Sequence, residues 1–445
     1  MSDKALSIAY GTFCGMIVTV YLALVLPISK SFPFTDDWTY VAVLGSGWRN
    51  VLRWVAAPHN DHRIPFIKIM QFATLKASGF DFRAVLVLNV VWGLCGALAM
   101  FGVARRFRGY SHFGDLIVPM ILLNYAFGLF GWGFAAQYVM AVSSSAIFLY
   151  LFGKSIERGN SILEILSFCF LLVCALSGMN GLVVASVVSG GVFASCFLQQ
   201  PSTTRTVARY ASLVILLTCA AVYASWRPSG ASASPLSVPP GQIIDFAYHL
   251  SKSSFVVSAF IGAWWRSALV ICLTLAAAGV TFGQLQRAHE AGSDDLFTSA
   301  FYASFVGYIA LAASIVAGRA ARIPWVPGLE THYGYPVALI PIFAWLIISY
   351  SARPALKGML AMILLGLYTH SFVESARWRL NYAWWSAGHY AEIAQLIRSD
   401  LAPSEITRRY MSDLWYVDTP EIRKDMEDNI VKLRAYGGPL YGRAQ

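Results

Sequence analysis

Long apolar runs separated by short polar breaks recur along the whole chain, and they constrain its fold more than any other feature. Of the 445 residues, 57% are hydrophobic and only 13% are charged, whereas soluble domains carry about 25% charged residues. Because a membrane-spanning helix needs about 20 apolar residues, we predict an all-α, polytopic membrane protein with about eleven spans. The expected spans are residues 8–29, 84–103, 115–131, 137–153, 162–178, 182–199, 209–226, 255–282, 298–318, 334–350 and 357–375.

Lysine and arginine are shared unequally between alternate loops, and this predicts the orientation in the membrane. Short cytoplasmic loops are enriched in both residues. The short loops 132–136 and 179–181 carry neither. We therefore expect a cytoplasmic N-terminus, and an odd number of spans then places the C-terminus outside. The basic residues of the expected cytoplasmic side are Lys4, Arg105, Arg106, Arg108, Lys154, Arg158, Arg205, Arg209, Arg287, Arg353 and Lys357.

The net charge and the positions of the cysteines reduce the number of possible functions. A net charge of +10 in such a chain is typical of anchoring at the inner membrane face. No soluble patch interleaves basic and aromatic residues, so we do not expect a nucleic-acid partner. All seven cysteines fall inside apolar spans, which predicts neither a disulfide framework nor a zinc site.

Four segments on the outer side are long enough to form more than a turn. The first, 30–83, carries an apolar stripe at helical spacing, which predicts an amphipathic helix lying in the membrane interface. The second, 227–254, is rich in Ser, Pro and Gly and predicts a flexible or lid-like loop. The third is 319–333, and the last is the tail, 376–445. The stripe in the first segment consists of Leu44, Trp48, Val51, Leu52 and Val55.

The composition changes sharply in the tail, which divides the chain into a membrane module, 1–375, and a C-terminal region, 376–445. Thr419 is an expected N-cap, Pro420 follows at the first helical position, and Gly437 ends that helix. We therefore predict a small helical cap on the outer face, too small to fold alone. The apolar stripe of its helix is Ile422, Met426, Ile430 and Leu433.

Two adjacent carboxylates, Asp36 and Asp37, follow the first span directly. A carboxylate at the water–lipid boundary can act as a general base when it reaches the hydroxyl that it deprotonates. A second pair, Asp294 and Asp295, stands on the expected cytoplasmic side without comparable surroundings, so an acidic pair alone is a weak signal. Position and aromatic neighbours favour catalysis by the first pair. Those neighbours are Phe34, Trp38 and Tyr40.

A second polar cluster, Pro-His-Asn-Asp-His-Arg-Ile-Pro, occupies residues 58–65. Imidazole and carboxylate are common metal ligands, but their crowding in a loop without helical pairing favours another role. We expect His59, Asp61 and His62 to place hydrogen bonds and charge around an anionic substrate. Arg63 offers a planar fork suited to phosphate. A divalent metal site and an interfacial polar loop without a catalytic role are the alternatives.

Further cations stand in the third outer segment. Arg319 and Arg322 end a span beside a Pro-Trp-Val-Pro turn. They can clamp a phosphate, or they can extend to lipid head groups as arginines at the ends of spans do. His332 and Tyr333 follow and are further candidates for the same site.

The arrangement resembles the GT-C superfamily of membrane glycosyltransferases. Shared features are an N-in first helix, a long outer loop with an Asp-Asp pair, interfacial helices and an outer C-terminal cap. The runs Asp-Asp-Trp at 36–38 and His-Asn-Asp-His-Arg-Ile at 59–64 are similar to those of a group of bacterial members. Asp61 departs from a common Glu, and His332 stands where a Ser-Arg-Tyr-like run is expected. Short motifs at Gly131–Phe134, Asn180–Gly181 and Gly318–Arg319 also fall at similar places.

The resemblance implies a GT-C-like bundle in a bacterial inner membrane, with a periplasmic site. It implies an inverting hexosyl- or pentosyltransferase that takes sugar from a polyprenyl-phosphate carrier, with Asp36 or Asp37 as the base. Its partners would be that donor, a cell-envelope glycan or lipid acceptor, and membrane lipids, and no cofactor is expected. The residues expected to bind substrate or lipid phosphate are His59, Asp61, His62, Arg63, Arg319, Arg322, His332 and Tyr333.

The leading alternative is a transporter or flippase for a lipid-linked or anionic solute. Such a protein needs ionisable residues buried in mid-span along a path. The predicted spans hold very few, and Asp115 and Glu164 lie near helix starts on the inner side. A membrane acyltransferase would need a histidine and an acid within a span, which the sequence does not suggest.

Overall fold

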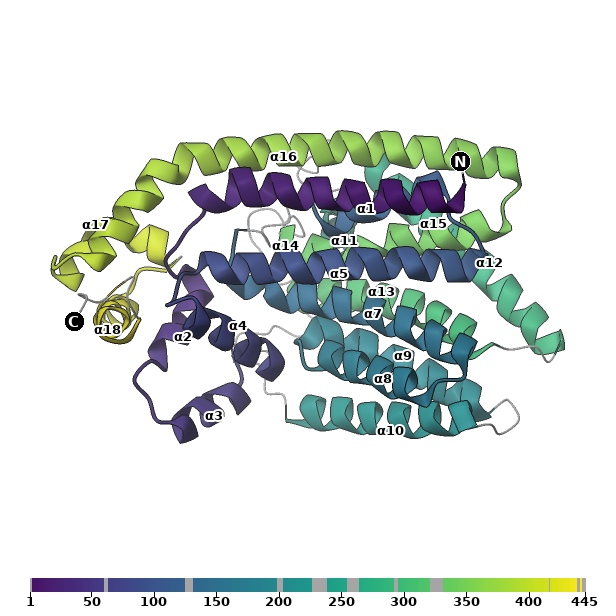
Figure 1. Cartoon of the computed structure of the whole chain (residues 1–445), viewed down its shortest axis with the longest axis horizontal. Helices are drawn as coiled ribbons and strands as arrows, with labels where there is room; N and C mark the ends of the chain where they lie inside the picture. The colour runs from purple at the N-terminus through teal and green to yellow at the C-terminus, as the bar shows by residue number, and fades with distance from the viewer. Residues whose placement is uncertain are drawn as a thin grey trace.

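The computed structural model describes residues 2–59, 63–124, 131–197, 203–225, 238–253, 264–291, 295–320, 331–415, 417–437 and 441. Every regular element in these residues is a helix, as the apolar periodicity predicts. The long helices lie side by side in one bundle (Figure 1). The chain is therefore an all-α, multi-pass membrane protein.

Within these residues, nine helical segments have the length and apolar composition of a membrane span. Two shorter apolar segments lie in the other two predicted spans, 115–131 and 162–178, so each predicted span contains a helix, but only nine of the eleven reach the length of a membrane span within the described residues. The nine are α1 (Asp3–Val20) with η1 (Tyr21–Val25) and η2 (Leu26–Ile28), α5 (Arg83–Arg108), η5 (Gly133–Ala135) with α7 (Ala136–Arg158), α9 (Met179–Phe197), α10 (Thr203–Ala224), α12 (Trp264–Ala291), α13 (Leu296–Arg319), α14 (Thr331–Val337) with α15 (Leu339–Ser351), and α16 (Pro354–Arg398). The shorter two are η4 (Phe113–Leu116) with α6 (Ile117–Leu122), and α8 (Ser161–Ala175).

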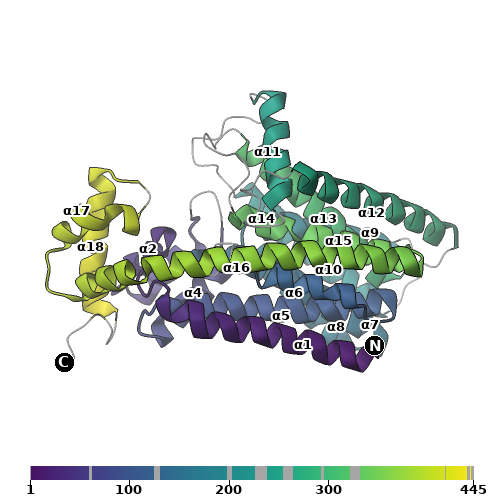
Figure 2. The same cartoon turned by 90° about the horizontal axis from the view of Figure 1, so that it is seen from above.

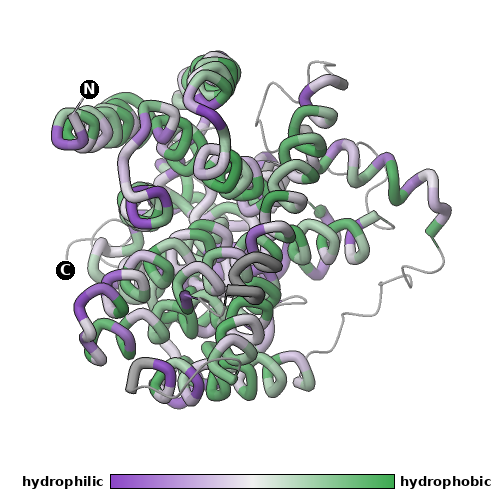
Figure 3. The backbone as a smooth tube through the Cα atoms, turned by 90° about the vertical axis from the view of Figure 1, so that its right-hand side faces the viewer, coloured by the Kyte–Doolittle hydropathy of each residue, from purple (hydrophilic) through white to green (hydrophobic). Residues whose placement is uncertain are grey.

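The bundle has two chemically different ends. Arg105 donates to Ser7 near the start of α1, and Arg106 pairs with Glu157 near the end of α7; we call this the basic end. The opposite end, which carries Asp36 and Asp37, is the aspartate end. The two chain termini lie at opposite ends of the molecule (Figure 1). Figure 3 shows the bundle from the basic end, and most of its helices are hydrophobic along their length.

Close packing in the bundle depends on small residues. A methyl group added at Gly96 would strike Ser143, and one added at Gly102 would strike Tyr150. These glycines lie on α5 and their partners on α7, so the two helices approach closely where the glycines stand. The spans that contain α7 and α15 are the most buried of the nine, at 72% and 83% of their most apolar stretches, so both lie inside the bundle.

The last helix of the bundle is much longer than its predicted span. The apolar run ends near 375, but α16 continues without a break to Arg398 and is 45 residues long. Its second half contains no proline and is rich in Ala and Arg, which favour a helix even where the hydrophobicity falls. Figure 2 shows α16 running past the bundle to α17 (Pro403–Leu414). The helix therefore carries tail residues to the aspartate end.

The first outer segment folds into short helices at the aspartate end. They are η3 (Thr35–Asp37), α2 (Trp38–Ala42), α3 (Trp48–Ala56) and α4 (Pro65–Ala77). The helix α3 is the predicted amphipathic helix, and Trp48 and Leu52 are 69% and 55% exposed, as an interfacial helix requires. The predicted stripe was one residue too long. Leu44 is buried before a turn at Gly45, because its side chain joins the core beneath α2.

The C-terminal helix α18 (Pro420–Tyr436) follows its predicted boundaries. The Thr419 hydroxyl accepts a hydrogen bond from the Ile422 N–H at 3.3 Å, and the Gly437 N–H donates to the Leu433 carbonyl at 2.8 Å. Met426, Ile430 and Leu433 are buried in a core shared with the first outer segment.

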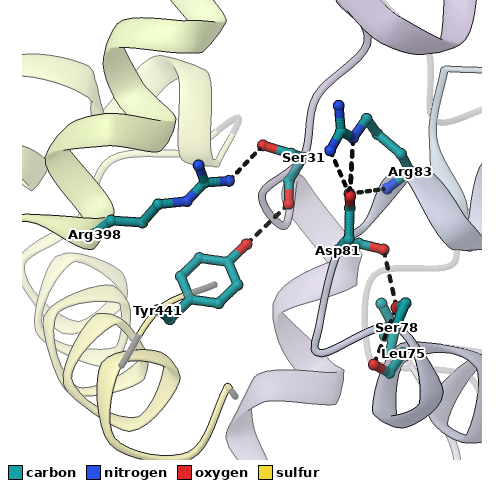
Figure 4. Close-up of polar contacts among 7 residues, drawn as sticks. All are labelled: Ser31, Leu75, Ser78, Asp81, Arg83, Arg398 and Tyr441. Atoms are coloured by element: carbon teal, nitrogen blue, oxygen red, sulfur yellow. Dashed lines mark hydrogen bonds and ion pairs between the residues drawn. The ribbon is translucent and has the colours of Figure 1, made fainter. Parts of the chain in front are cut away.

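Polar contacts at Ser31 also bind the tail to the first outer segment (Figure 4). The Tyr441 hydroxyl donates to the Ser31 carbonyl at 2.9 Å, and the Arg398 guanidinium donates to the Ser31 hydroxyl at 3.1 Å. Nearby, Arg83 forms an ion pair with Asp81 at the start of α5. The tail is thus packed and hydrogen-bonded to the segment that holds the aspartates.

One predicted loop contains a helix. Residues 240–253 form α11 (Pro240–Ser253), which projects from the bundle in Figure 2. Composition favoured a loop here because Ser, Pro and Gly crowd residues 228–239, immediately ahead of the helix. Residues 227–237 and 254 of this segment lie outside the described residues.

Candidate active site

A single turn of 3₁₀ helix, η3, holds the two aspartates in different surroundings. Asp37 is 3% exposed. Its Oδ1 accepts a hydrogen bond from the Phe134 N–H at 2.8 Å, and its Oδ2 accepts one from the Phe34 N–H at 3.4 Å. Gly133 permits this approach, because a methyl group there would strike Val85 and crowd Asp37. Asp37 therefore ties the first outer segment to the Gly131–Phe134 turn.

Asp36 has a different partner. Its Oδ1 lies 3.1 Å from the His59 Nε2, and the two side chains are 11% and 12% exposed. The His59 ring in turn packs 4.4 Å, centroid to centroid, from the Phe134 ring. The second oxygen of Asp36 forms no hydrogen bond within the described residues.

Burial gives the aspartate site an unusual charge state. It raises the pKa of Asp37 to about 7, with a further increase from Asp36, although the two backbone N–H groups and Lys30 act in the opposite sense. Lys30 shows the complementary effect, because burial and the nearby Arg379 lower its pKa to about 7. Perturbed ionisable groups of both signs, in one place, are typical of functional sites.

A cavity of about 280 Å³ lies next to Lys30 and Phe34, at the aspartate end. Lys30 and Arg379 are the cations in its wall, and Phe34 connects the wall to Asp37 through its backbone N–H. The ammonium of Lys30 lies 3.1 Å from the centroid of the Phe34 ring. The remaining lining residues are mostly aromatic or small: Ile28, Ser29, Gly131, Trp132, His332, Trp378, Tyr382, Ala383, Ser386 and Tyr390.

Arg379 is fixed against the glycine-rich turn. Its guanidinium occupies the space that a side chain at Gly131 would need, and it lies 5.9 Å from the centroid of the Tyr382 ring. Its Nε is buried and has no hydrogen-bond partner among the described residues. A buried, unpaired N–H is costly, so an anion in the cavity would supply the missing acceptor.

A chain of aromatic contacts extends from the cavity to the third outer segment. The His332 ring lies 6.0 Å from that of Trp132 and 4.1 Å from that of Tyr333. The guanidinium of Arg319 lies 5.4 Å from the Tyr333 ring. The structure therefore places His332 in the cavity wall, with Tyr333 and Arg319 behind it.

Other predicted site residues lie elsewhere. Arg63 donates to the backbone carbonyls of Ala56 at 2.8 Å and of Ser225 at 3.5 Å, so it braces the loop after α3. Asp295 caps α13 by accepting hydrogen bonds from the first turn, which explains the second acidic pair as a helix start. The remaining predicted site residues, Asp61, His62 and Arg322, and the comparison residue Asp294 lie outside the described residues.

Sequence reasoning missed Lys30 and Arg379. Lys30 follows the first span immediately, where a lysine usually extends to lipid head groups. Arg379 falls in the predicted tail because the apolar run ends near 375, and only the continuous α16 brings it to the cavity wall. A signal for Arg379 was present in the cluster of aromatic residues around it, Trp378, Tyr382, Trp384 and Trp385.

Comparisons with known proteins show a distant structural likeness. No protein-family model and no curated protein sequence matches the chain. Among solved structures, an oligosaccharyltransferase of Archaeoglobus fulgidus, solved with a tethered acceptor peptide, is 11% identical with a TM-score of 0.40. The match covers 94% of this chain and 59% of that one, so the chain spans about three fifths of its length. So loose a likeness carries no functional argument, and function has to be inferred from the site.

Proposed function

We propose that the chain is an inverting glycosyltransferase that moves a sugar from a polyprenyl-phosphate carrier to a hydroxyl of a cell-envelope glycan or lipid. The observation that carries the proposal is a cavity that holds Lys30 and Arg379 and that is joined to the buried aspartates through Phe34, a wall residue whose backbone N–H donates to Asp37. A carboxylate supplies a base and two cations supply an anion site. Their position at one end of a membrane bundle suits a donor whose phosphate lies at the interface and whose tail lies among the helices.

The proposed reaction is one displacement. The second oxygen of Asp36 removes the proton of the acceptor hydroxyl while the oxygen of that hydroxyl attacks the anomeric carbon of the sugar. The bond from this carbon to the phosphate oxygen breaks, and the electron pair leaves with the polyprenyl phosphate. A single displacement inverts the anomeric centre. His59 orients Asp36, and Asp37 positions both by holding η3 against the Gly131–Phe134 turn.

Lys30 and Arg379 act on the leaving group in this scheme. Negative charge grows on the phosphate as the sugar departs, and fixed cations in a shielded cavity stabilise it most in the transition state. Arg379 presents a planar fork, whereas Lys30 contributes a compact charge. His332, Tyr333 and Arg319 complete the cavity wall and its support.

The proposed orientation follows from the charge of the two ends. The basic end holds the lysines and arginines that favour the cytoplasm, so we place the aspartate end in the periplasm of a bacterial inner membrane. Exposed aromatic side chains on α16, Trp384 at 68% and Trp385 at 81%, suit the aromatic belt at a membrane–water interface.

Transfer can be tested directly. Purified protein would be incubated with a synthetic short-chain polyprenyl phosphate carrying a labelled sugar, with lipid and glycan extracts of bacterial envelopes as acceptors. We expect a labelled acceptor of inverted anomeric configuration and release of free polyprenyl phosphate. Movement of intact donor across vesicle membranes, without a new glycosidic bond for any donor sugar or acceptor, would instead identify a transporter or flippase.

The pH dependence of kcat/KM should report the loss of the proton from the Lys30 ammonium. Because its pKa in the free enzyme is lowered to about 7, the ammonium is present below that pH and is lost above it. We expect kcat/KM to fall as the pH rises through about 7, and kcat to fall at higher pH because bound phosphate stabilises the ammonium. The variant Lys30→Arg should lose this alkaline limb. An unchanged limb in that variant would exclude Lys30 as its cause.

A further inference from the structure

The basic end contains a cavity of about 500 Å³ that the proposed reaction does not use. Three cations line it, Arg105, Arg106 and Lys154, together with one carboxylate, Glu157. Three positive charges against one negative charge leave a surplus of two. The cavity is within the size range of small-molecule sites, about 300–1,000 Å³, and its charge selects an anion.

The cations of this cavity are held in place by specific contacts. The Arg106 side chain crosses Gly153 of α7, where a methyl group would strike it, and its guanidinium lies 4.8 Å from the Phe297 ring. Lys154 pairs with Glu157 at 2.8 Å. Within the part of the chain that the structure describes, the buried Arg106 Nε has no hydrogen-bond partner. An arginine that merely extends to the lipid surface would need none of this support.

The cavity also has an apolar side, and the order of its walls matches a phospholipid. Its polar residues lie at the ends of α5 and α7, while Leu98, Phe101 and Leu149 line it further into the bundle. Leu98 precedes Arg105 by seven residues, which places it about 10 Å deeper in the membrane along the helix. Leu98 is also 45% exposed, so an acyl chain can lie against it.

We propose that this cavity binds the phosphate head group of an anionic membrane lipid, with the acyl chains along Leu98 and Leu149. Basic pockets between spanning helices are suited to such head groups. The carboxylate of Glu157 forms ion pairs with Arg106 and Lys154, and a lipid phosphate would replace the carboxylate as their partner. The proposal is independent of the transferase reaction at the opposite end.

Lipid binding can be measured by native mass spectrometry of the full chain in neutral detergent. The probes are phosphatidylglycerol and phosphatidylcholine with identical acyl chains, and inorganic phosphate as a competitor. We expect a preference for phosphatidylglycerol that falls about fivefold for each cation replaced, in Arg105→Gln, Arg106→Gln and Lys154→Gln. Arg158→Gln, on the same helix end but outside the cavity, should keep the preference.

Glu157→Gln provides a test of opposite sign. Removing the competing carboxylate should raise the preference for phosphatidylglycerol. The variant also gains net positive charge, so Asp428→Asn, which removes an exposed carboxylate on α18 outside the cavity, is the control for charge alone. Lys154 and Arg105 are partly exposed, so their variants should fold even if Arg106→Gln does not. Equal preference in the parent and in both of these variants would overturn the site. Displacement of the lipid by inorganic phosphate at equal concentration would show that the cavity takes free phosphate and not a lipid.

Discussion

Asp36→Asn is expected to slow sugar transfer by about 10²–10⁴-fold, the usual cost of losing a general base, while the protein still inserts and folds. Asparagine keeps the shape and can still hydrogen-bond His59, so the loss should appear in kcat and leave the thermal unfolding midpoint almost unchanged. The measurement is transfer from the synthetic labelled donor by each purified variant. Asp428→Asn, an exposed carboxylate on α18, is the matched control and should transfer at the parent rate.

Asp37→Asn separates the two aspartates. An amide oxygen can still accept from the Phe134 N–H, so this variant should lose less activity than Asp36→Asn if Asp37 only positions the turn. Asp37→Ala should lose activity and stability together, because it leaves the Phe134 N–H buried without an acceptor. If Asp36→Asn transfers normally and Asp37→Asn is inactive, the two roles are reversed. Full activity in the double variant would remove the aspartates from the mechanism.

Replacement of Arg379 should have an effect of similar size. Loss of a donor that stabilises transition-state charge typically costs about 10²–10³-fold in kcat. Arg379→Ala should show at least this loss, and Arg379→Lys should also fail, because an ammonium cannot reproduce the fork that packs against Gly131. The contact strengthens as the sugar leaves, so kcat should fall more than the affinity for donor.

Arg377→Lys is the control for this experiment. Arg377 lies on the same helix, two residues earlier, and is exposed outside the cavity. Its variant should transfer sugar at the parent rate. If Arg379→Lys and Lys30→Arg both match the parent as well, a bare positive charge at each position is sufficient. If Arg379→Ala also matches the parent, phosphate recognition lies outside this cavity, with Arg319 and His332 as the next residues to replace.

The fold could be predicted well from the sequence because the fold depends mainly on local features, the apolar runs. Each apolar run must form a helix in lipid, since unpaired backbone groups are too costly there, and every predicted span contains a helix. The caps at Thr419 and Gly437 are also local signals, and α18 begins and ends where they predict. The end of α16 was not predicted, because hydrophobicity reports where lipid ends and not where a helix ends.

The candidate site was predicted only in part, because half of it is assembled from distant segments. Asp36 and His59 both belong to the first outer segment, so their pairing joins two polar clusters that are visible in the same stretch of sequence. Arg379 reaches the cavity only through the length of α16, and Gly131 matters because that arginine lies against it. No pattern near Asp36 indicates either contact. Arg63, the most prominent cation in sequence, is instead engaged by backbone carbonyls.

The most direct test of the central claim is a structure determined with a non-transferable donor, a polyprenyl phosphonate sugar. We predict phosphonate density in the cavity between Lys30 and Arg379, with the anomeric carbon as the sugar atom nearest the second oxygen of Asp36. The lipid tail should leave the cavity between helices toward the membrane. Phosphonate density at the basic end, or at the aspartate end but away from both Lys30 and Arg379, would contradict the assignment.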